Sequence, residues 1–439
     1  MKTASSNEQL SSEPKGGFRN LLRSIGPALI VASVVVGPGS ILTSSQVGTS
    51  FGYSMVWVLA LACALMLGMT ALSARIGVSI SGSLCDEIRA RSGASLAILA
   101  GVCVFLICTC FQFTNNLGVL AGLEPFTALS SAVKIGILCA GNLIVIAALF
   151  GFQSLYRPME KIVVAMVALM IIGFAGNLLL SQPSVISIIA GLWPTMPIES
   201  IGELFPQIVD EKLSDPFMPV QGLIGTTFSI AGAFYLAYLV QKKGWSVEDW
   251  TKGFADSAVG IIALGVISLM IMVTAAAVLH GKLAGDELKS TTDVAEALKP
   301  LFGQAAIVLF SLGLFAGAFS SFLVNALIGG TLLSDGLGLG SDMDTRWPKI
   351  FTVVSLLTGL GVAIYIQVAG VRPVGLIVFA QSLTVLGNPV LAGILVWLSR
   401  KRRSDGERMA PMWMTVVASV GFLLVLFLAI RTAIRLYFG

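Results

Sequence analysis

Residues 34–45 read Val-Val-Val-Gly-Pro-Gly-Ser-Ile-Leu-Thr-Ser-Ser, and the Gly37-Pro38-Gly39 triplet interrupts an otherwise apolar stretch. Inside a helix, glycine is about 1 kcal/mol and proline about 3 kcal/mol less favourable than alanine. A bilayer core tolerates the freed backbone groups only where they are buried in protein or line a cavity. The triplet therefore predicts a helix broken at membrane depth, a feature that points to a substrate site near the middle of the membrane. This break carries no acidic residue.

The composition defines the class of protein. Of the 439 residues, 56% are hydrophobic and only 11% are charged, with a mean hydropathy of +0.91. These values exclude a soluble globular protein and indicate a polytopic membrane protein. A net charge of +4 gives no support for nucleic-acid binding. The single histidine, His280, and six cysteines without a CxxC pair predict no metal cluster, disulfide framework or cofactor.

The hydropathy pattern predicts eleven membrane spans. Each apolar stretch is close to or above the length of about 20 residues that a helix needs to cross a bilayer. The stretches fall at about 24–48, 53–74, 95–122, 133–151, 159–180, 219–241, 253–280, 303–334, 348–369, 374–398 and 412–434.

The distribution of basic residues predicts the orientation. Most of the 27 Lys and Arg residues lie in alternate links, including the Arg400-Lys401-Arg402-Arg403 run between the last two spans. The acidic link at about 181–218 falls on the opposite side. The positive-inside rule thus predicts a multi-pass protein of the cell (inner) membrane, with a cytoplasmic N-terminus and an external C-terminus. Residues 1–20 are expected to form a disordered cytoplasmic tail.

The sixth predicted span contains a second weak point. Glycines at 222, 225 and 232 flank Thr226, Thr227 and Ser229 in the middle of this stretch. Small residues also occur where membrane helices merely pack closely. However, interruptions in the first span of each five-span half are typical of inverted-repeat transporters with discontinuous helices. The matching positions of the two breaks favour this interpretation.

At these residues the chain resembles the Nramp family of divalent-metal transporters, and the resemblance covers nearly all of it. It rests on several colinear segments with sequences similar to those of the family. They are Gly26-Pro27 with Gly37-Pro38-Gly39-Ser40, Phe51-Gly52-Tyr53, residues 72–77, residues 295–303, residues 315–321 with Gly329-Gly330, and residues 379–385.

The resemblance implies the fold. The family has an all-α, leucine-transporter-type architecture of two inverted five-helix repeats, here with an eleventh transmembrane helix. Helices 1 and 6 are then discontinuous. The expected transporter domain covers residues 21–439, with repeat one at about 24–180, repeat two at about 219–398 and the extra helix at about 412–434.

The metal-binding residues of the family do not carry over. Its first-span motif is Asp-Pro-Gly-Asn, whereas this chain has Gly37-Pro38-Gly39-Ser40. The Met-Pro-His of the sixth span falls on Ser229-Ile230-Ala231. The acidic pair of the third span falls on Asn116 and Val119. Of the side chains that surround the metal in the family, only Gln381 is expected to remain, together with backbone carbonyls.

The predicted site is therefore neutral and rich in small and hydroxyl residues. The second half of each broken helix begins with free amide groups that carry partial positive charge and favour a carboxylate or a polar neutral group. Gly232 is expected to start this half of the sixth span. The neighbouring polar residues Thr43, Ser44, Thr227, Asn115, Asn116 and Asn388 are further candidates. The predicted substrate-binding residues are Gly37, Pro38, Gly39, Ser40, Thr226, Ser229, Ile230, Ala231 and Gln381.

These observations favour a secondary transporter that moves a small organic carboxylate or an amino-acid-like solute. Two alternatives stay open: transport of Mg²⁺ or another divalent cation through neutral ligands, and a sensor that does not transport. An enzyme is disfavoured because no nucleophile–base pair or metal-binding cluster is visible. The expected partners are the solute or ion and the lipid bilayer, and a monomer is plausible.

Overall fold

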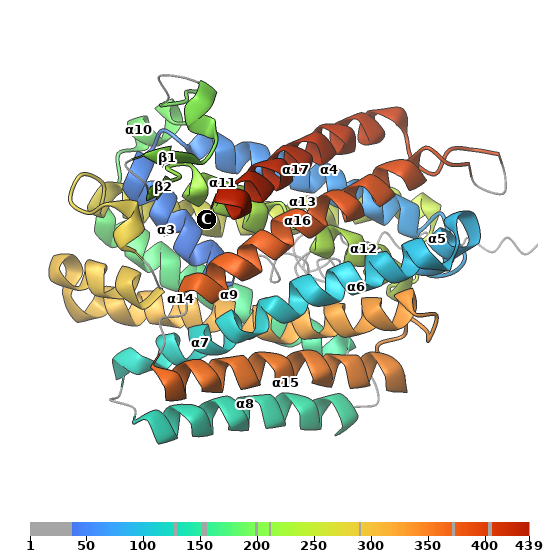
Figure 1. Cartoon of the computed structure of the whole chain (residues 1–439), viewed down its shortest axis with the longest axis horizontal. Helices are drawn as coiled ribbons and strands as arrows, with labels where there is room; N and C mark the ends of the chain where they lie inside the picture. Colours follow the sequence, from blue (N-terminus) through green and yellow to red (C-terminus); the bar gives the residue numbers. More distant parts are fainter. Residues whose placement is uncertain are drawn as a thin grey trace, which may run out of the picture.

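The computed structural model describes residues 37–126, 130–151, 156–197, 201–209, 212–288, 291–370, 374–402 and 406–438. The predicted cytoplasmic tail and the first half of the first predicted span lie outside these residues. The described chain is almost entirely helical, and its long helices lie side by side (Figure 1).

The long helices follow the predicted spans. Nine described helices are long and apolar enough to cross a membrane, and they fall on predicted spans two to nine and eleven. α3 is the described half of the first span, and α16 occupies the tenth. In order they are α3 (Pro38–Phe51), α4 (Val56–Gly77), α6 (Ala94–Cys110) with α7 (Gln112–Leu123), α8 (Ser131–Gly151), α9 (Tyr156–Ser181), α11 (Met218–Thr227) with α12 (Ile230–Lys242), α13 (Trp250–Val278), α14 (Thr291–Gly336), α15 (Arg346–Ala369), α16 (Val374–Ser399) and α17 (Met412–Phe438).

Several short elements in the links were not predicted. The apolar stretches in these segments are too short to be predicted as membrane spans. They are α5 (Leu84–Ser92), α10 (Val185–Ala190), the 3₁₀ turns η1 (Glu124–Phe126), η2 (Ile201–Leu204), η3 (Val247–Asp249) and η4 (Gly285–Glu287), and the antiparallel pair β1 (Gln207–Val209) and β2 (Lys212–Ser214).

The predicted break in the sixth span is present. α11 ends at Thr227, Phe228 leaves the helical region with φ −91° and ψ 67°, and α12 begins at Ile230. The expectation that Gly232 starts the second half is wrong by two residues. Ser229 caps the helix instead, because its hydroxyl accepts a hydrogen bond from the Gly232 amide.

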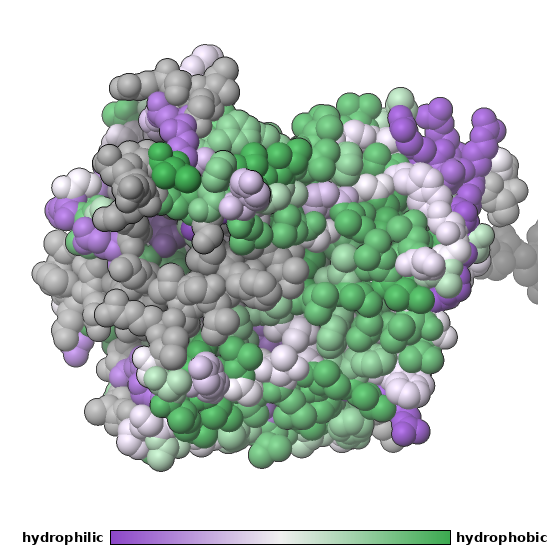
Figure 2. Space-filling view, in the orientation of Figure 1, coloured by the Kyte–Doolittle hydropathy of each residue, from purple (hydrophilic) through white to green (hydrophobic). Residues whose placement is uncertain are grey.

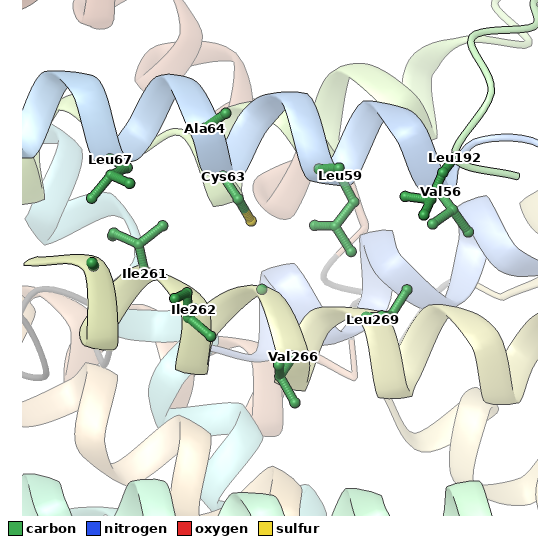
Figure 3. A pocket seen from close by; sticks show the side chains of 13 residues that line it. Val56, Leu59, Cys63, Ala64, Leu67, Leu192, Ile261, Ile262, Val266 and Leu269 are labelled. Atoms are coloured by element: carbon green, nitrogen blue, oxygen red, sulfur yellow. The ribbon is translucent and has the colours of Figure 1, made fainter. Parts of the chain in front are cut away.

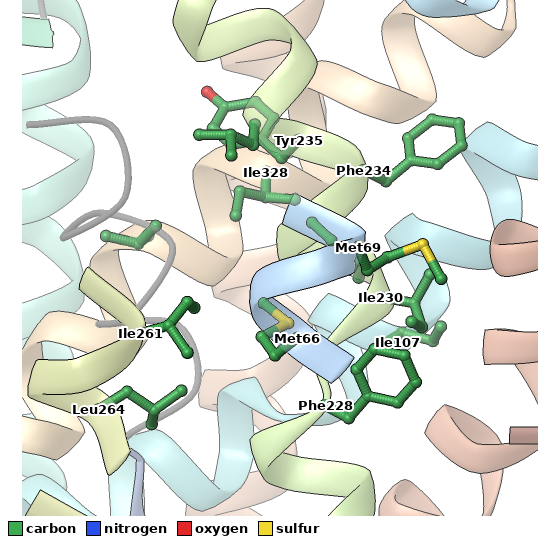
Figure 4. Close-up of a cluster of buried hydrophobic side chains, with 14 of the residues drawn as sticks. Met66, Met69, Ile107, Phe228, Ile230, Phe234, Tyr235, Ile261, Leu264 and Ile328 are labelled. Atoms are coloured by element: carbon green, nitrogen blue, oxygen red, sulfur yellow. The ribbon is translucent and has the colours of Figure 1, made fainter. Parts of the chain in front are cut away.

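Large apolar side chains hold this break in place. Phe228 and Ile230 are fully buried and lie next to Met66 and Met69 of α4 (Figure 4). Methionine side chains are flexible and fill irregular gaps in a core. The irregular backbone is therefore enclosed by protein, as a break at membrane depth requires.

The surface agrees with a membrane location. In Figure 2, hydrophobic residues cover the middle of the visible described face, and hydrophilic residues gather toward the end that carries α5 and the link between α16 and α17. Large apolar side chains such as Leu143, Ile144 and Ile172 are more than 60% exposed. Such a band suits contact with lipid tails rather than water.

Helix packing supplies a first testable prediction. A Cβ added at Gly48 of α3 would lie 2.1 Å from the Met272 carbonyl oxygen of α13, so the two helices touch through their backbones. Gly48→Ala should force them apart, at an overpacking cost of about 1–3 kcal/mol. We expect a lower melting temperature for the purified protein in detergent.

Gly136→Ala is the matched control for Gly48→Ala. It lies within helix α8, and beyond the backbone of its own helix no atom lies within 4 Å of the Cβ that it would add. Replacing a helical glycine at an open position is neutral or stabilising. Equal melting temperatures for the two variants would contradict the close packing of α3 on α13.

Candidate substrate site

A small cavity lies where α3 of the first span and the broken sixth span meet the third, eighth and tenth spans. Its volume is about 40 Å³. The walls come from α3 and the residue before it, the α6–α7 region, α11 and α12 around the break, α14 and α16. The lining residues are Gly37, Gly39, Ser40, Ile107, Phe111, Asn115, Gly225, Thr226, Ser229, Ala231, Asn325 and Thr384.

The first wall is the start of α3. Gly37 is extended, with φ −112° and ψ −176°, and Pro38 occupies the first turn of the helix, where its missing N–H costs nothing. The Ser40 hydroxyl donates to the Gly37 carbonyl at 2.9 Å. Gly39 and Ser40 belong to the first turn, whose amides have no acceptor within the helix. Helix α3 therefore presents N–H groups at the cavity.

The second wall is the break in the sixth span. Ser229 and Ala231 line the cavity at the start of α12, and Thr226 lines it at the end of α11. The Thr226 hydroxyl lies 3.4 Å from that of Thr43, so α3 and α11 are in direct contact here. The cavity thus receives amide donors from α12 and carbonyl acceptors from the last turn of α11.

The third wall carries an amide side chain. Asn115 of α7 is 2% exposed, and among the described residues its Nδ2 has no hydrogen-bond partner. Its neighbour Asn116 points elsewhere, because its Oδ1 accepts from Asn142 Nδ2 at 2.8 Å and its own amide donates to the Gln112 carbonyl. A buried donor without a partner costs free energy. Asn115 is therefore poised to donate to a bound group.

The lining carries no formal charge. None of the described residues that line the cavity is ionisable. Within the described ranges, no three His, Cys, Asp or Glu side chains come together as metal ligands would. What the cavity offers is amide N–H groups, hydroxyls and carbonyl oxygens.

The structure brings together most of the predicted site residues. Gly37, Gly39, Ser40, Thr226, Ser229 and Ala231 all line the cavity. Pro38 and Ile230 do not: both are buried in packing contacts of the helix starts. Gln381 lies in the part of α16 whose side chains are outside the described residues. Substrate binding by these residues stays a prediction.

The other polar residues that the sequence predicts as candidates also include some that line the cavity and some that do not. Asn115 lines the cavity, whereas Ser44, Thr227 and Asn388 are buried away from it. Sequence reasoning missed Asn325 and Thr384, which contribute from α14 and α16. A polar side chain in a membrane span is a signal in itself. By this criterion the sequence identifies Asn325 as a candidate, but it does not show whether the side chain faces the cavity.

A larger cavity elsewhere is unsuited to a polar solute. It has a volume of about 340 Å³ and lies between α4 and α13, lined by apolar side chains such as Leu59, Leu67 and Ile261 (Figure 3). The thiol of Cys63 faces this space. The smaller polar cavity at the breaks is therefore the candidate substrate site.

The broken sixth span, the helix start at Gly37-Pro38 and the polar cavity between them define a membrane transporter with discontinuous helices. The chain also matches the family model described as Natural resistance-associated macrophage protein-like over residues 28–435. It belongs to the Nramp family.

The similar proteins agree with this assignment. A divalent metal cation transporter MntH from Pectobacterium carotovorum subsp. carotovorum (strain PC1) is 24% identical over 392 residues, covering 86% of this chain and 89% of the relative. A manganese transporter structure from Eremococcus coleocola has a TM-score of 0.75 at 19% identity, over 97% of this chain and 90% of that one. The structure of Mhp1, a nucleobase-cation-symport-1 family transporter, has a TM-score of 0.54 at 15% identity, over 94% and 90%. The predicted leucine-transporter-type fold is confirmed.

Proposed function

We propose that the chain is a secondary transporter that carries a small solute bearing a carboxylate group. The observation that carries the proposal is a cavity that faces two helix N-termini and has no acidic side chain among its described lining residues. Helix N-termini stabilise negative charge, and the effect is larger where water is excluded. The unpartnered Nδ2 of Asn115 adds a third donor.

The chemistry of the lining argues against tight binding of a transition metal. Such ions favour imidazole, thioether or carboxylate ligands, and the lining residues that the structure describes include none of them. A bare divalent cation also needs anionic or strong neutral ligands to replace its water. Organic cargo is compatible with this architecture, since the Mhp1 structure of similar fold holds bromovinylhydantoin.

A second candidate function is transport of a divalent cation. The curated relatives bear the name divalent metal cation transporter, and the cavity of about 40 Å³ is of a size that suits an ion. Asn115 Oδ1, the hydroxyls of Ser40 and Thr226, and carbonyls at the end of α11 are the available oxygens. Hard cations such as Mg²⁺ accept neutral oxygen ligands and retain several waters.

A binding experiment separates the two functions. Ligands that bind the folded state raise its stability by about 2.7 kcal/mol at a hundred times their dissociation constant. We expect small carboxylates or amino acids to raise the melting temperature of the purified protein, and the same compounds to be taken up by liposomes that contain it. Saturable uptake of Mn²⁺ or Mg²⁺ without any response to carboxylates would favour the second candidate. Uptake of either kind would exclude a sensor that does not transport.

A further inference from the structure

The membrane helices form two bodies with the candidate site between them. α3, α4, α11, α12 and α13 pack chiefly on one another, and we call them the four-span body. α6, α7, α8, α9, α14 and α15 do the same and form the five-span body (Figure 1). The cavity takes residues from both. A solute leaves such a site only when the two bodies separate at one end.

A buried carboxylate connects the two bodies at the end that carries α5. Asp335, at the end of α14, is 1% exposed. Its Oδ2 accepts from the Tyr238 hydroxyl of α12 at 2.6 Å, and its Oδ1 accepts from the Ser83 hydroxyl at 2.7 Å. The amide of Cys85 also faces Oδ2, at 3.3 Å. Three segments far apart in the sequence thus meet on one side chain.

Other polar contacts surround this cluster. Arg89 of α5 donates to the main-chain carbonyls of Asp335 and Gly336 at 3.0 and 2.8 Å. Lys242, one turn beyond Tyr238 on α12, pairs with Asp342 at 2.8 Å and with Asp344 at 3.2 Å. Partial burial opposes the ionised form, yet the hydrogen bond from Lys242 lowers the pKa of Asp342. Because this pair is partly exposed, it contributes less than the buried cluster.

The contact between the bodies on the other side of the cavity contains polar side chains without partners among the described residues. There α13 packs on α9, and the side chains of Thr274 and Asn177 line a small cavity of about 10 Å³ together with Ser45. Among the described residues, Thr274 Oγ1 and Asn177 Oδ1 have no partner. Buried polar groups without partners weaken a contact, whereas satisfied ones hold it. Among the described residues, Tyr235 Oη and Thr331 Oγ1 at the α5 end also lack a partner. What distinguishes the α5 end is therefore the hydrogen-bonded carboxylate of Asp335.

We propose that the Asp335–Tyr238–Ser83 cluster is the latch that keeps the α5 end of the transport pathway closed. The inference rests on the proposed transport function, but not on the identity of the solute. α12 carries both the N-terminus that faces the cavity and, nine residues after Ser229, the Tyr238 hydroxyl. At a rise of 1.5 Å per residue, the N-terminus of α12 and Tyr238 lie about 13 Å apart along the helix axis. A shift of α12 on solute binding pulls Tyr238 away from Asp335.

When the α5 end opens, the Asp335 carboxylate loses the hydroxyl donors of Tyr238 and Ser83, and other donors must replace them. A carboxylate accepts hydrogen bonds with both oxygens, and a buried one without donors is costly. Water has to enter as Tyr238 and Ser83 withdraw. Cys85 then becomes accessible to reagents in water. In the closed structure its side chain is 0% exposed and its sulfur lies 3.4 Å from the Tyr238 hydroxyl.

Cys85 is thus a natural reporter of the latch. The experiment uses the full chain with the other five cysteines replaced by serine or alanine, in vesicles of both orientations. A membrane-impermeant maleimide is added without any solute, and the rate of Cys85 labelling is measured. We expect Tyr238→Phe and Asp335→Asn to raise this rate at least tenfold (on the order of 1.4 kcal/mol), from the α5 side only.

Tyr235→Phe is the matched control. Tyr235 lies one turn earlier on α12, is 0% exposed, and stacks on Tyr238 with ring centroids 5.9 Å apart. No hydrogen bond from its hydroxyl to Asp335 is present among the described residues. This variant removes the same group at a neighbouring buried position, so it should label like the parent. If Asp335→Asn does not fold, Tyr238→Phe and Ser83→Ala carry the test.

Three results overturn the latch. They are equal labelling rates for Tyr238→Phe and the parent, equally faster labelling in Tyr235→Phe and Tyr238→Phe, and labelling from the opposite side alone. Because no solute is present, these outcomes are independent of the binding screen. If the protein binds no carboxylate, the labelling experiment can still support the latch. If the protein transports a carboxylate, the labelling experiment can still contradict the latch.

Discussion

Gly37→Asp is expected to abolish carboxylate binding. Position 37 lines the cavity, and a side chain there would point toward Ser321 and Asn115. Two like charges about 4 Å apart repel by about 4 kcal/mol at an effective dielectric constant of 20, which corresponds to roughly a thousandfold loss of affinity. Uptake of the solute into liposomes and its effect on the melting temperature should both disappear.

Gly37→Asn separates charge from size. A Cβ at this position would lie 3.0 Å from Ser321 Oγ and 3.3 Å from Asn115 Oδ1, so any side chain crowds the site. Asparagine crowds it as aspartate does, but without the negative charge. We expect Gly37→Asn to weaken binding far less than Gly37→Asp. If Gly37→Asp instead strengthens the binding of Mn²⁺ to a protein that already binds it, the divalent cation is the substrate and the carboxylate proposal is wrong.

The fold was predictable because its determinants are local. The Gly37-Pro38-Gly39 triplet and the apolar runs can be read from neighbouring residues, and the structure places helix ends near them. The start of α12 was misplaced by two residues because a glycine was given more weight than a capping serine. Ser229 satisfies an amide of the first turn, and this outweighs the intrinsic cost of Gly232 inside the helix.

The candidate site was only partly predictable because its walls come from distant parts of the chain. Ser40 and Thr226 were identifiable because each lies close to a break that the sequence predicts. Asn325 and Thr384 lie in continuous helices, where the direction of a side chain depends on how the helix packs. For the same reason, nothing local separates Asn115, which faces the cavity, from Asn116, which bonds Asn142.

Arg431→Met should produce the largest loss of stability. Arg431 of α17 is 2% exposed and donates to Asp215, to Gln221 Oε1 and to the Leu204 carbonyl. It thereby joins the eleventh span to α11 and to the link that precedes it. Removing one partner of a buried pair costs about 3–5 kcal/mol. Asp215 would then keep only Arg435, whose guanidinium lies 3.7 Å away. We expect little folded monodisperse protein after extraction in detergent, or a sharply lowered melting temperature.

Two further variants show whether the buried charge is the cause. Arg435 lies 3.7 Å from Asp215 and is more exposed than Arg431, so Arg435→Met should change the melting temperature little. The double variant Arg431→Met with Asp215→Asn should recover part of the loss, because no buried carboxylate is then left without Arg431. A double variant that melts no higher than Arg431→Met alone would show that the arginine acts through its bonds to Leu204 and Gln221. In that case the ion pair between Arg431 and Asp215 contributes little to the packing of the eleventh span.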